Sequence, residues 1–206
     1  MTDASAAPAP PRGGARRILV LNGHPDPAPT HLCAALAAAY VRGARAAGRE
    51  VTTLDVGALD FPLIRSLEEY GAAPMPADIA AAQEAVAAAD HIVIVFPIWF
   101  GGLPAHLKGF FEQLLRRGFA LSSPSRPMQS LLTGKSARLI VTMGLPTTIF
   151  HLVLGGHGLG ALERGLFWVT GVQPVRHTIL GGALKPSPAR VARWFSRMEA
   201  LGRAGA

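Results

Sequence analysis

The chain has 206 residues, half of them apolar, and a formal net charge of +7. This length suits one α/β domain with a full core, and the apolar content is too high for a disordered chain. The longest apolar runs are only as long as a strand, so we expect no stable insertion into a membrane.

The predicted elements alternate between strands and helices. Strands are predicted over 16–21, 50–55, 91–96, 137–142 and 172–180. Helices are predicted over 30–47, 78–89, 103–117, 161–169 and 187–201. The segments 61–76 and 144–160 are expected to be irregular because they are rich in proline or glycine. This alternation predicts a parallel sheet covered by helices on both faces, with the continuously apolar third strand at its centre.

The two ends of the sequence carry different signals. Residues 1–14 are rich in Ala, Pro and Gly and have neither the apolar core nor the basic lead-in of a signal peptide. We therefore predict a disordered lead over 1–14 and a single domain over 15–206. The single cysteine, Cys33, cannot form an internal disulfide, and this favours the cytoplasm.

Much of the positive charge lies near the two ends of the chain. The arginines near the C-terminus are spaced three, four and six residues apart, as expected for the solvent-exposed face of a terminal helix. No aromatic residues interleave with them to form a platform on which bases would stack. We therefore expect no nucleic-acid partner.

A ligand site is expected where three loops follow the first, third and fourth strands. In a doubly wound sheet, ligands bind beyond the carboxyl ends of the strands, at the point where the strand order reverses. For the order 2-1-3-4-5, this point lies between the first and third strands. The loops at this edge cover residues 22–30, 97–102 and 143–160.

The first loop contains three prolines and runs into the start of a predicted helix. Exposed amides and the positive end of the helix dipole suit a phosphate at this place. Thr30 offers a hydroxyl donor, and His24 and His31 offer imidazole donors. An interpretation of equal weight is that Thr30 is only an N-cap and the prolines only stiffen a turn.

The second loop carries two adjacent aromatic residues at the end of the most apolar strand. Trp99 or Phe100 would supply a flat wall for a planar ring system, and Gly101 and Gly102 would let the backbone approach it. Taken alone, the aromatic residues favour a simpler interpretation, in which their side chains cover the top of the sheet.

Motifs of competing chemistries are absent or misplaced. No G-x-G-x-x-G follows the first strand, and Gly134-Lys135-Ser136 precedes a strand where a P-loop would follow one. The sequence has no H-E-x-x-H, no paired cysteines and no G-x-S-x-G, so we expect no metal site.

The segment 96–112 resembles the flavodoxin-like NAD(P)H:quinone oxidoreductases. It consists of an apolar strand, a proline, two aromatic residues and glycine, followed by Pro-Ala and Leu-Lys-Gly. The segments 18–32 and 144–181 are similar too, so the resemblance covers about Arg16 to Leu184. It looks closest to bacterial members related to the potassium-efflux ancillary and general-stress oxidoreductases. The resemblance implies a flavodoxin-like three-layer α/β sandwich with a five-stranded parallel sheet of order 2-1-3-4-5.

The resemblance also implies which residues bind the cofactor. In this family the first loop holds the flavin phosphate, the second holds the isoalloxazine ring, and the third borders the other side of the ring. Residue by residue, this implies the following: His24, Thr30, His31 and Leu32 at the phosphate; Pro97, Ile98, Trp99, Phe100 and Gly101 at the ring; and Thr142, Met143 and Gly144 on its other side. Trp99 and His157, which matches a family histidine, are the implied catalytic residues.

The activity that the resemblance implies is a ping-pong transfer of hydride from NAD(P)H through flavin N5 to a quinone or similar small acceptor. The expected cofactor is FMN, with FAD as the alternative, and members of the family are usually homodimers. The third loop lacks the tyrosine that the quinone reductases often have, but the hydride step itself needs no protein acid. A flavodoxin-type electron carrier and a flavin-binding regulatory subunit of a transporter remain alternative functions.

Overall fold

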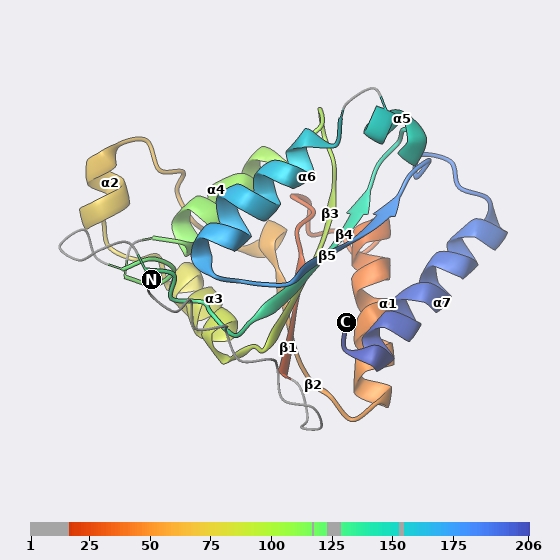
Figure 1. Cartoon of the computed structure of the whole chain (residues 1–206), viewed down its shortest axis with the longest axis horizontal. Coiled ribbons are helices and arrows are strands. Elements are labelled where there is room, and N and C mark those ends of the chain that lie inside the picture. Colours follow the sequence, from red (N-terminus) through yellow and green to blue (C-terminus); the bar gives the residue numbers. More distant parts are fainter. Residues whose placement is uncertain (1–16, 117, 123–128, 153–154) are drawn as a thin grey trace, which may run out of the picture.

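The computed structural model describes residues 17–116, 118–122, 129–152 and 155–206. Its centre is a five-stranded parallel sheet with the strand order 2-1-3-4-5 (Figure 1). The strands are β1 (Arg17–Asn22), β2 (Glu50–Asp55), β3 (His91–Pro97), β4 (Ser136–Thr142) and β5 (Val175–Leu180). This arrangement confirms the predicted flavodoxin-like fold. The lead predicted over 1–14 lies outside the described residues.

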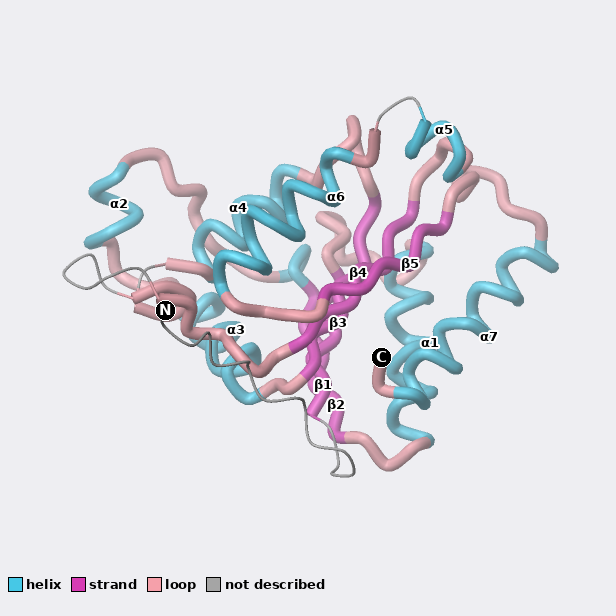
Figure 2. The backbone as a smooth tube through the Cα atoms, in the orientation of Figure 1, coloured by secondary structure: helices cyan, strands magenta, loops and turns pink. Residues whose placement is uncertain are grey.

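Helices cover both faces of this sheet, which gives three layers (Figure 2). One face packs against α1 (Leu32–Ala46) and α7 (Pro188–Ala204), which also contact each other extensively. The other face packs against α3 (Ala77–Ala88), α4 (Ala105–Leu114), α6 (His157–Leu162) and the π-helical segment η2 (Glu163–Trp168). Two further short helices, α2 (Leu67–Ala72) and α5 (Thr147–Leu152), lie toward the periphery.

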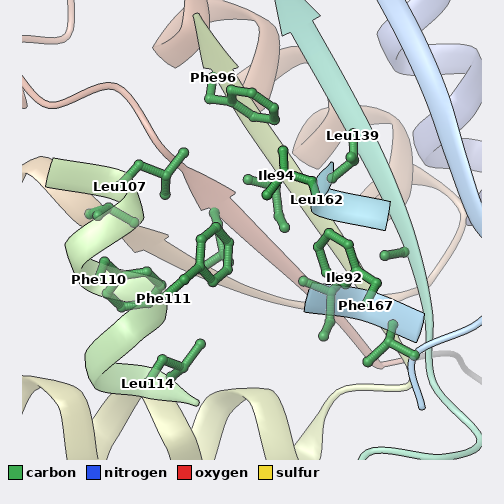
Figure 3. Close-up of a cluster of buried hydrophobic side chains, with 14 of the residues drawn as sticks. Ile92, Ile94, Phe96, Leu107, Phe110, Phe111, Leu114, Leu139, Leu162 and Phe167 are labelled. Carbon is green, nitrogen blue, oxygen red and sulfur yellow. The ribbon is translucent and has the colours of Figure 1, made fainter. Parts of the chain in front are cut away.

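The central strand β3 is buried on both faces, as its continuous apolarity predicts. Ile92, Ile94 and Phe96 point toward α4 and η2, where they join a large aromatic and aliphatic cluster (Figure 3). The alternate residues Val93 and Val95 belong to the second core, beneath α1 and α7. Packing in both clusters holds in place the strands whose carboxyl ends form the predicted site.

Three local predictions were wrong. The segment predicted as irregular over 61–76 contains α2, which begins where Ser66 Oγ accepts a hydrogen bond from the Glu69 amide at 3.0 Å. The third loop contains α5 and α6, so the helix predicted from residue 161 begins at His157 and continues as a π-helix. The last strand begins at Val175, because Gly171 has a positive φ of 88° and Pro174 has no amide hydrogen to donate.

Among the described residues, none of the helices has both the length and the apolarity needed to cross a lipid bilayer.

Candidate functional site

The loops after β1, β3 and β4 meet around a cavity of about 330 Å³, which we call the three-loop cavity. This volume falls at the lower end of the range for small-molecule sites, roughly 300–1,000 Å³. The cavity is lined by His24, His31, Leu32, Cys33, Pro97, Ile98, Trp99, Thr142, Met143, Gly144, Ala183 and Leu184. Most of the residues predicted to bind a cofactor therefore lie together at the predicted edge of the sheet.

Two imidazoles form one end of this cavity, which we call the histidine end. The rings of His24 and His31 are stacked, with centroids 3.9 Å apart and planes 18° from parallel. Asp26 Oδ2 lies 2.8 Å from His31 Nε2, and the Asp26 amide donates to His24 Nδ1 at 3.1 Å. Helix α1 begins directly afterwards, and its N-cap His31 makes no side-chain capping bond. The amides of the first helical turn therefore receive no cap from this side chain.

The first loop is anchored to the end of β2. Asn22 Nδ2 donates to Asp55 Oδ2 at 3.3 Å, while Asn22 Oδ1 accepts from the His24 amide at 3.3 Å. Asp55 Oδ1 also accepts from the amide of Gly57 at 3.2 Å. Backbone packing at Gly57 is close, because a Cβ there would lie 2.7 Å from the Pro25 carbonyl oxygen. This network fixes the loop on which both histidines stand.

The second loop forms the other end, which we call the aromatic end. The backbones of Trp99 and Gly102 exchange hydrogen bonds of 3.1 and 3.0 Å across a two-residue turn. Both central residues have positive φ, 49° at Phe100 and 81° at Gly101, which is the pattern of a type I′ turn. A phenylalanine in this left-handed region costs roughly 1–2 kcal/mol. The turn holds the Trp99 ring, which is 6.1 Å from the ring of His24, in the cavity wall.

Two glycines allow the third loop to lie close to its neighbours, Gly158 to the second loop and Gly144 to the loop after the fifth strand. A Cβ on Gly158 would lie 1.8 Å from the carbonyl oxygen of Gly101, so α6 packs directly on the turn of the second loop. A Cβ on Gly144 would lie 2.8 Å from the Leu184 side chain. Directly after β3, the Ile98 amide donates to the carbonyl of Thr142, the last residue of β4, at 2.8 Å. The second and third loops therefore form one continuous wall.

The floor of the cavity contains Cys33, to which the sequence analysis gave no role in the site. Cys33 Sγ lies 3.5 Å from Thr142 Oγ1, and both residues are buried. Burial raises the pKa of the Cys33 thiol to about 11, although the Thr142 hydrogen bond opposes this shift. Ala183 and Leu184 also line the cavity, although no motif singled them out. They lie in the loop after the fifth strand, and the sequence analysis considered only the loops after strands one, three and four.

Four predicted site residues lie outside this lining: Thr30, Phe100, Gly101 and His157. Thr30 is exposed and does not cap the helix, since α1 begins at Leu32. The side chain of Phe100 is fully exposed at the tip of its turn. His157 is also exposed, and its ring packs against Gly155, where a Cβ would lie 2.4 Å from Nε2.

A larger apolar groove of about 550 Å³ lies between α4 and the helical segment formed by α6 and η2. Its lining includes Leu103, Phe111, Leu162 and Leu166. The groove also reaches Gly102 at the aromatic end. Its lining is mostly apolar, and its Lys108 forms an ion pair with Glu112, so the groove offers an anionic cofactor fewer donors than the histidine end does. The smaller three-loop cavity is therefore the better candidate for a flavin site.

The fold and the position of this cavity define a flavodoxin-like α/β protein. A family model described as having a flavodoxin-like fold matches residues 16–201, and the chain belongs to this family. An uncharacterized NAD(P)H oxidoreductase from Haemophilus influenzae is 30% identical over 138 residues, covering 65% of this chain and 68% of that protein. NAD(P)H dehydrogenase (quinone) 1 from Rattus norvegicus is 27% identical over 215 residues, covering 90% of this chain and 77% of the relative.

The solved structure of Smu.1420 from Streptococcus mutans is also similar. It is 26% identical, has a TM-score of 0.70, and covers 91% of this chain and 99% of its own. Together, the family match and the sequence relatives confirm the resemblance stated from the motifs. They also confirm the expectation that the chain is an oxidoreductase enzyme.

Proposed function

We propose that this oxidoreductase binds FMN in the three-loop cavity and uses it to transfer electrons from NAD(P)H to a quinone or similar small acceptor. The observation that carries the proposal is the meeting of the three loops at the point where the strand order reverses, with imidazoles at one end and an aromatic wall at the other. The relatives named as NAD(P)H oxidoreductases and quinone dehydrogenases support the reaction class.

The chemistry of the lining residues fits a phosphorylated flavin. His24, His31 and the start of α1 offer donors and a positive helix end to the phosphate. Trp99 and Ile98 offer a flat apolar surface to the ring, and Met143 would contribute a further apolar contact from the third loop. We assign the phosphate to the histidine end and the ring to the aromatic end.

A bound flavin would supply the two-electron chemistry, accepting hydride from NAD(P)H and passing it to the acceptor in alternating half-reactions. The protein's contribution is to orient the reactants and to exclude water. The Trp99 turn and the Gly158 contact hold the wall in place through backbone hydrogen bonds and close packing. His157, which the resemblance implies to be catalytic, is exposed and outside the lining, so we propose only a minor role for it in protonating a reduced acceptor.

We further propose that a second copy of the chain completes the mouth of the cavity. Two exposed apolar side chains support this: Phe100 at the tip of its turn, and Leu184, which lines the cavity and is 83% exposed. Large apolar side chains gathered around a site are typical of an interaction surface.

The test is an anaerobic titration of the flavin-loaded protein with NADPH and then NADH, followed by its visible absorption bands. We expect the bands to bleach and to return when a quinone is added. A protein that binds flavin but is reduced by neither nucleotide would instead be a carrier or a regulatory subunit. A protein that takes up no flavin would refute the assignment of the cavity.

A further inference from the structure

One residue, Asp26, contacts both imidazoles of the histidine end, His31 through its carboxylate and His24 through its backbone. Asp26 Oδ2 lies 2.8 Å from His31 Nε2, and the backbone of Asp26 contacts His24 Nδ1 through its amide at 3.1 Å and its carbonyl at 3.0 Å. The two rings line the three-loop cavity, whereas Asp26 is outside the lining. Asp26 therefore lies behind the pair and reaches a ligand only through the histidines.

The carboxylate is itself fixed in position. Asp26 Oδ1 accepts a hydrogen bond from the Ala28 amide at 2.9 Å, so that each oxygen of the carboxylate has a separate partner. The Ala28 amide and then the contact with His31 lower the pKa of Asp26. The group is therefore an anion at neutral pH, and it forms an ion pair with His31 when that ring carries a hydrogen on both nitrogens, so that Nε2 donates to the carboxylate and Nδ1 is left as a second donor.

These contacts determine which ring nitrogens remain for a ligand. The carboxylate engages Nε2 of His31, which leaves Nδ1 of that ring. The backbone of Asp26 engages Nδ1 of His24, which leaves Nε2 of that ring. The two rings are stacked with centroids 3.9 Å apart and both line the three-loop cavity, so the two remaining nitrogens belong to the same end of it. Adjacent N–H donors of this kind suit the oxygens of one phosphate group.

We propose that Asp26 is a positioning residue that orients the His24–His31 pair and forms an ion pair with a doubly donating His31, so that both rings donate to a phosphate monoester dianion and the site selects FMN over unphosphorylated riboflavin. The inference rests on the proposed function. It adds the residue behind the phosphate contact and the property of the ligand that this residue selects.

The alternative is that the carboxylate opposes the ligand. Asp26 is exposed, and a negative charge near a phosphate dianion repels it unless the histidines stand between them. The two roles predict opposite effects of removing the charge. An orienting carboxylate strengthens phosphate binding, whereas a competing carboxylate weakens it.

The test measures the affinities of wild-type protein and the Asp26→Asn variant for FMN and for riboflavin by fluorescence quenching. We expect the variant to lose roughly tenfold in affinity for FMN, by analogy with the loss that follows removal of the carboxylate behind a metal-binding histidine, with riboflavin affinity changed less than about twofold. Asp26→Glu should recover part of the preference for FMN. Glu50→Gln, which removes an exposed carboxylate at the start of β2, is the matched control and should leave both affinities unchanged.

Each contrary result has a definite meaning. Equal losses for FMN and riboflavin would mean that Asp26 only supports the loop, and a gain in FMN affinity would mean that it competes with the phosphate. Either result, or an unchanged FMN preference, overturns the inference and leaves the proposed function intact. A wild-type protein that binds neither flavin overturns the proposed function together with the inference.

Discussion

The two ends of the three-loop cavity are built in different ways. At the histidine end, hydrogen bonds that involve the side chains of Asp26, Asp55 and Asn22 hold the first loop and its two imidazole rings. At the aromatic end, a backbone turn and the close approach of Gly158 hold Trp99 in place. Hydrogen bonds to side chains determine charge and direction, whereas backbone packing determines shape. Changes at the histidine end should therefore alter selectivity for charge, and changes at the aromatic end should alter affinity for the ring.

The largest expected effect concerns Cys33, in the floor beneath both ends. Its pKa of about 11, against an ordinary value near 9, leaves roughly a hundredfold less thiolate at neutral pH, so alkylation should be slower by at least that factor. The rate of labelling with a maleimide, compared with that of a free thiol between pH 7 and 11, measures this. We expect the rate to keep rising up to about pH 11. A plateau near pH 9 would contradict the raised pKa.

Labelling of Cys33 also tests whether the histidine end and the aromatic end share one floor. An added group on the floor fills the cavity from below, and we expect it to abolish the binding of FMN and riboflavin alike. A labelled protein that loses only one of the two ligands would show that Cys33 belongs to one end and not to the shared floor.

Gly158→Ala should damage the aromatic end selectively. Its Cβ would lie 1.8 Å from the Gly101 carbonyl oxygen, so α6 must move away from the turn, at a cost of about 1–3 kcal/mol in the free energy of unfolding. Urea unfolding followed by circular dichroism measures the cost. Gly160→Ala is the matched control on the same helix, because a Cβ there meets nothing within 4 Å. Equal stability of the two variants would refute the close packing at Gly158.

Trp99→Leu should have a smaller effect on binding. Replacing the aromatic wall should lower the affinities for FMN and riboflavin by the same roughly threefold to tenfold factor, because both ligands share the ring. Fluorescence titration of both ligands checks this. Trp168→Leu, at an exposed tryptophan of η2, serves as the control. A change in the ratio of the two affinities would show that the two ends do not act separately.

Most of the fold and of the cavity lining followed from the sequence, because buried parallel strands and the loops after them leave clear local patterns. The carboxyl ends of β1, β3 and β4 meet wherever the order 2-1-3-4-5 is formed. What could not be predicted depends on contacts between distant residues. Neither the pairing of Cys33 with Thr142 nor the approach of Gly158 to Gly101 leaves any mark in the local sequence. The exposure of Phe100 follows from its turn and not from its residue type.

His157→Asn should have the smallest effect, although the resemblance implies a catalytic histidine there. The ring is exposed, packs against Gly155, and contributes to the lining of neither cavity, so water can protonate a reduced acceptor in its place. We expect kcat/KM with a quinone to fall by less than about threefold, far below the hundredfold or more typical of a general acid. Ferricyanide, which takes up electrons without a proton, is the control acceptor. A selective loss with the quinone would show that His157 reaches the acceptor and that proton transfer depends on the third loop.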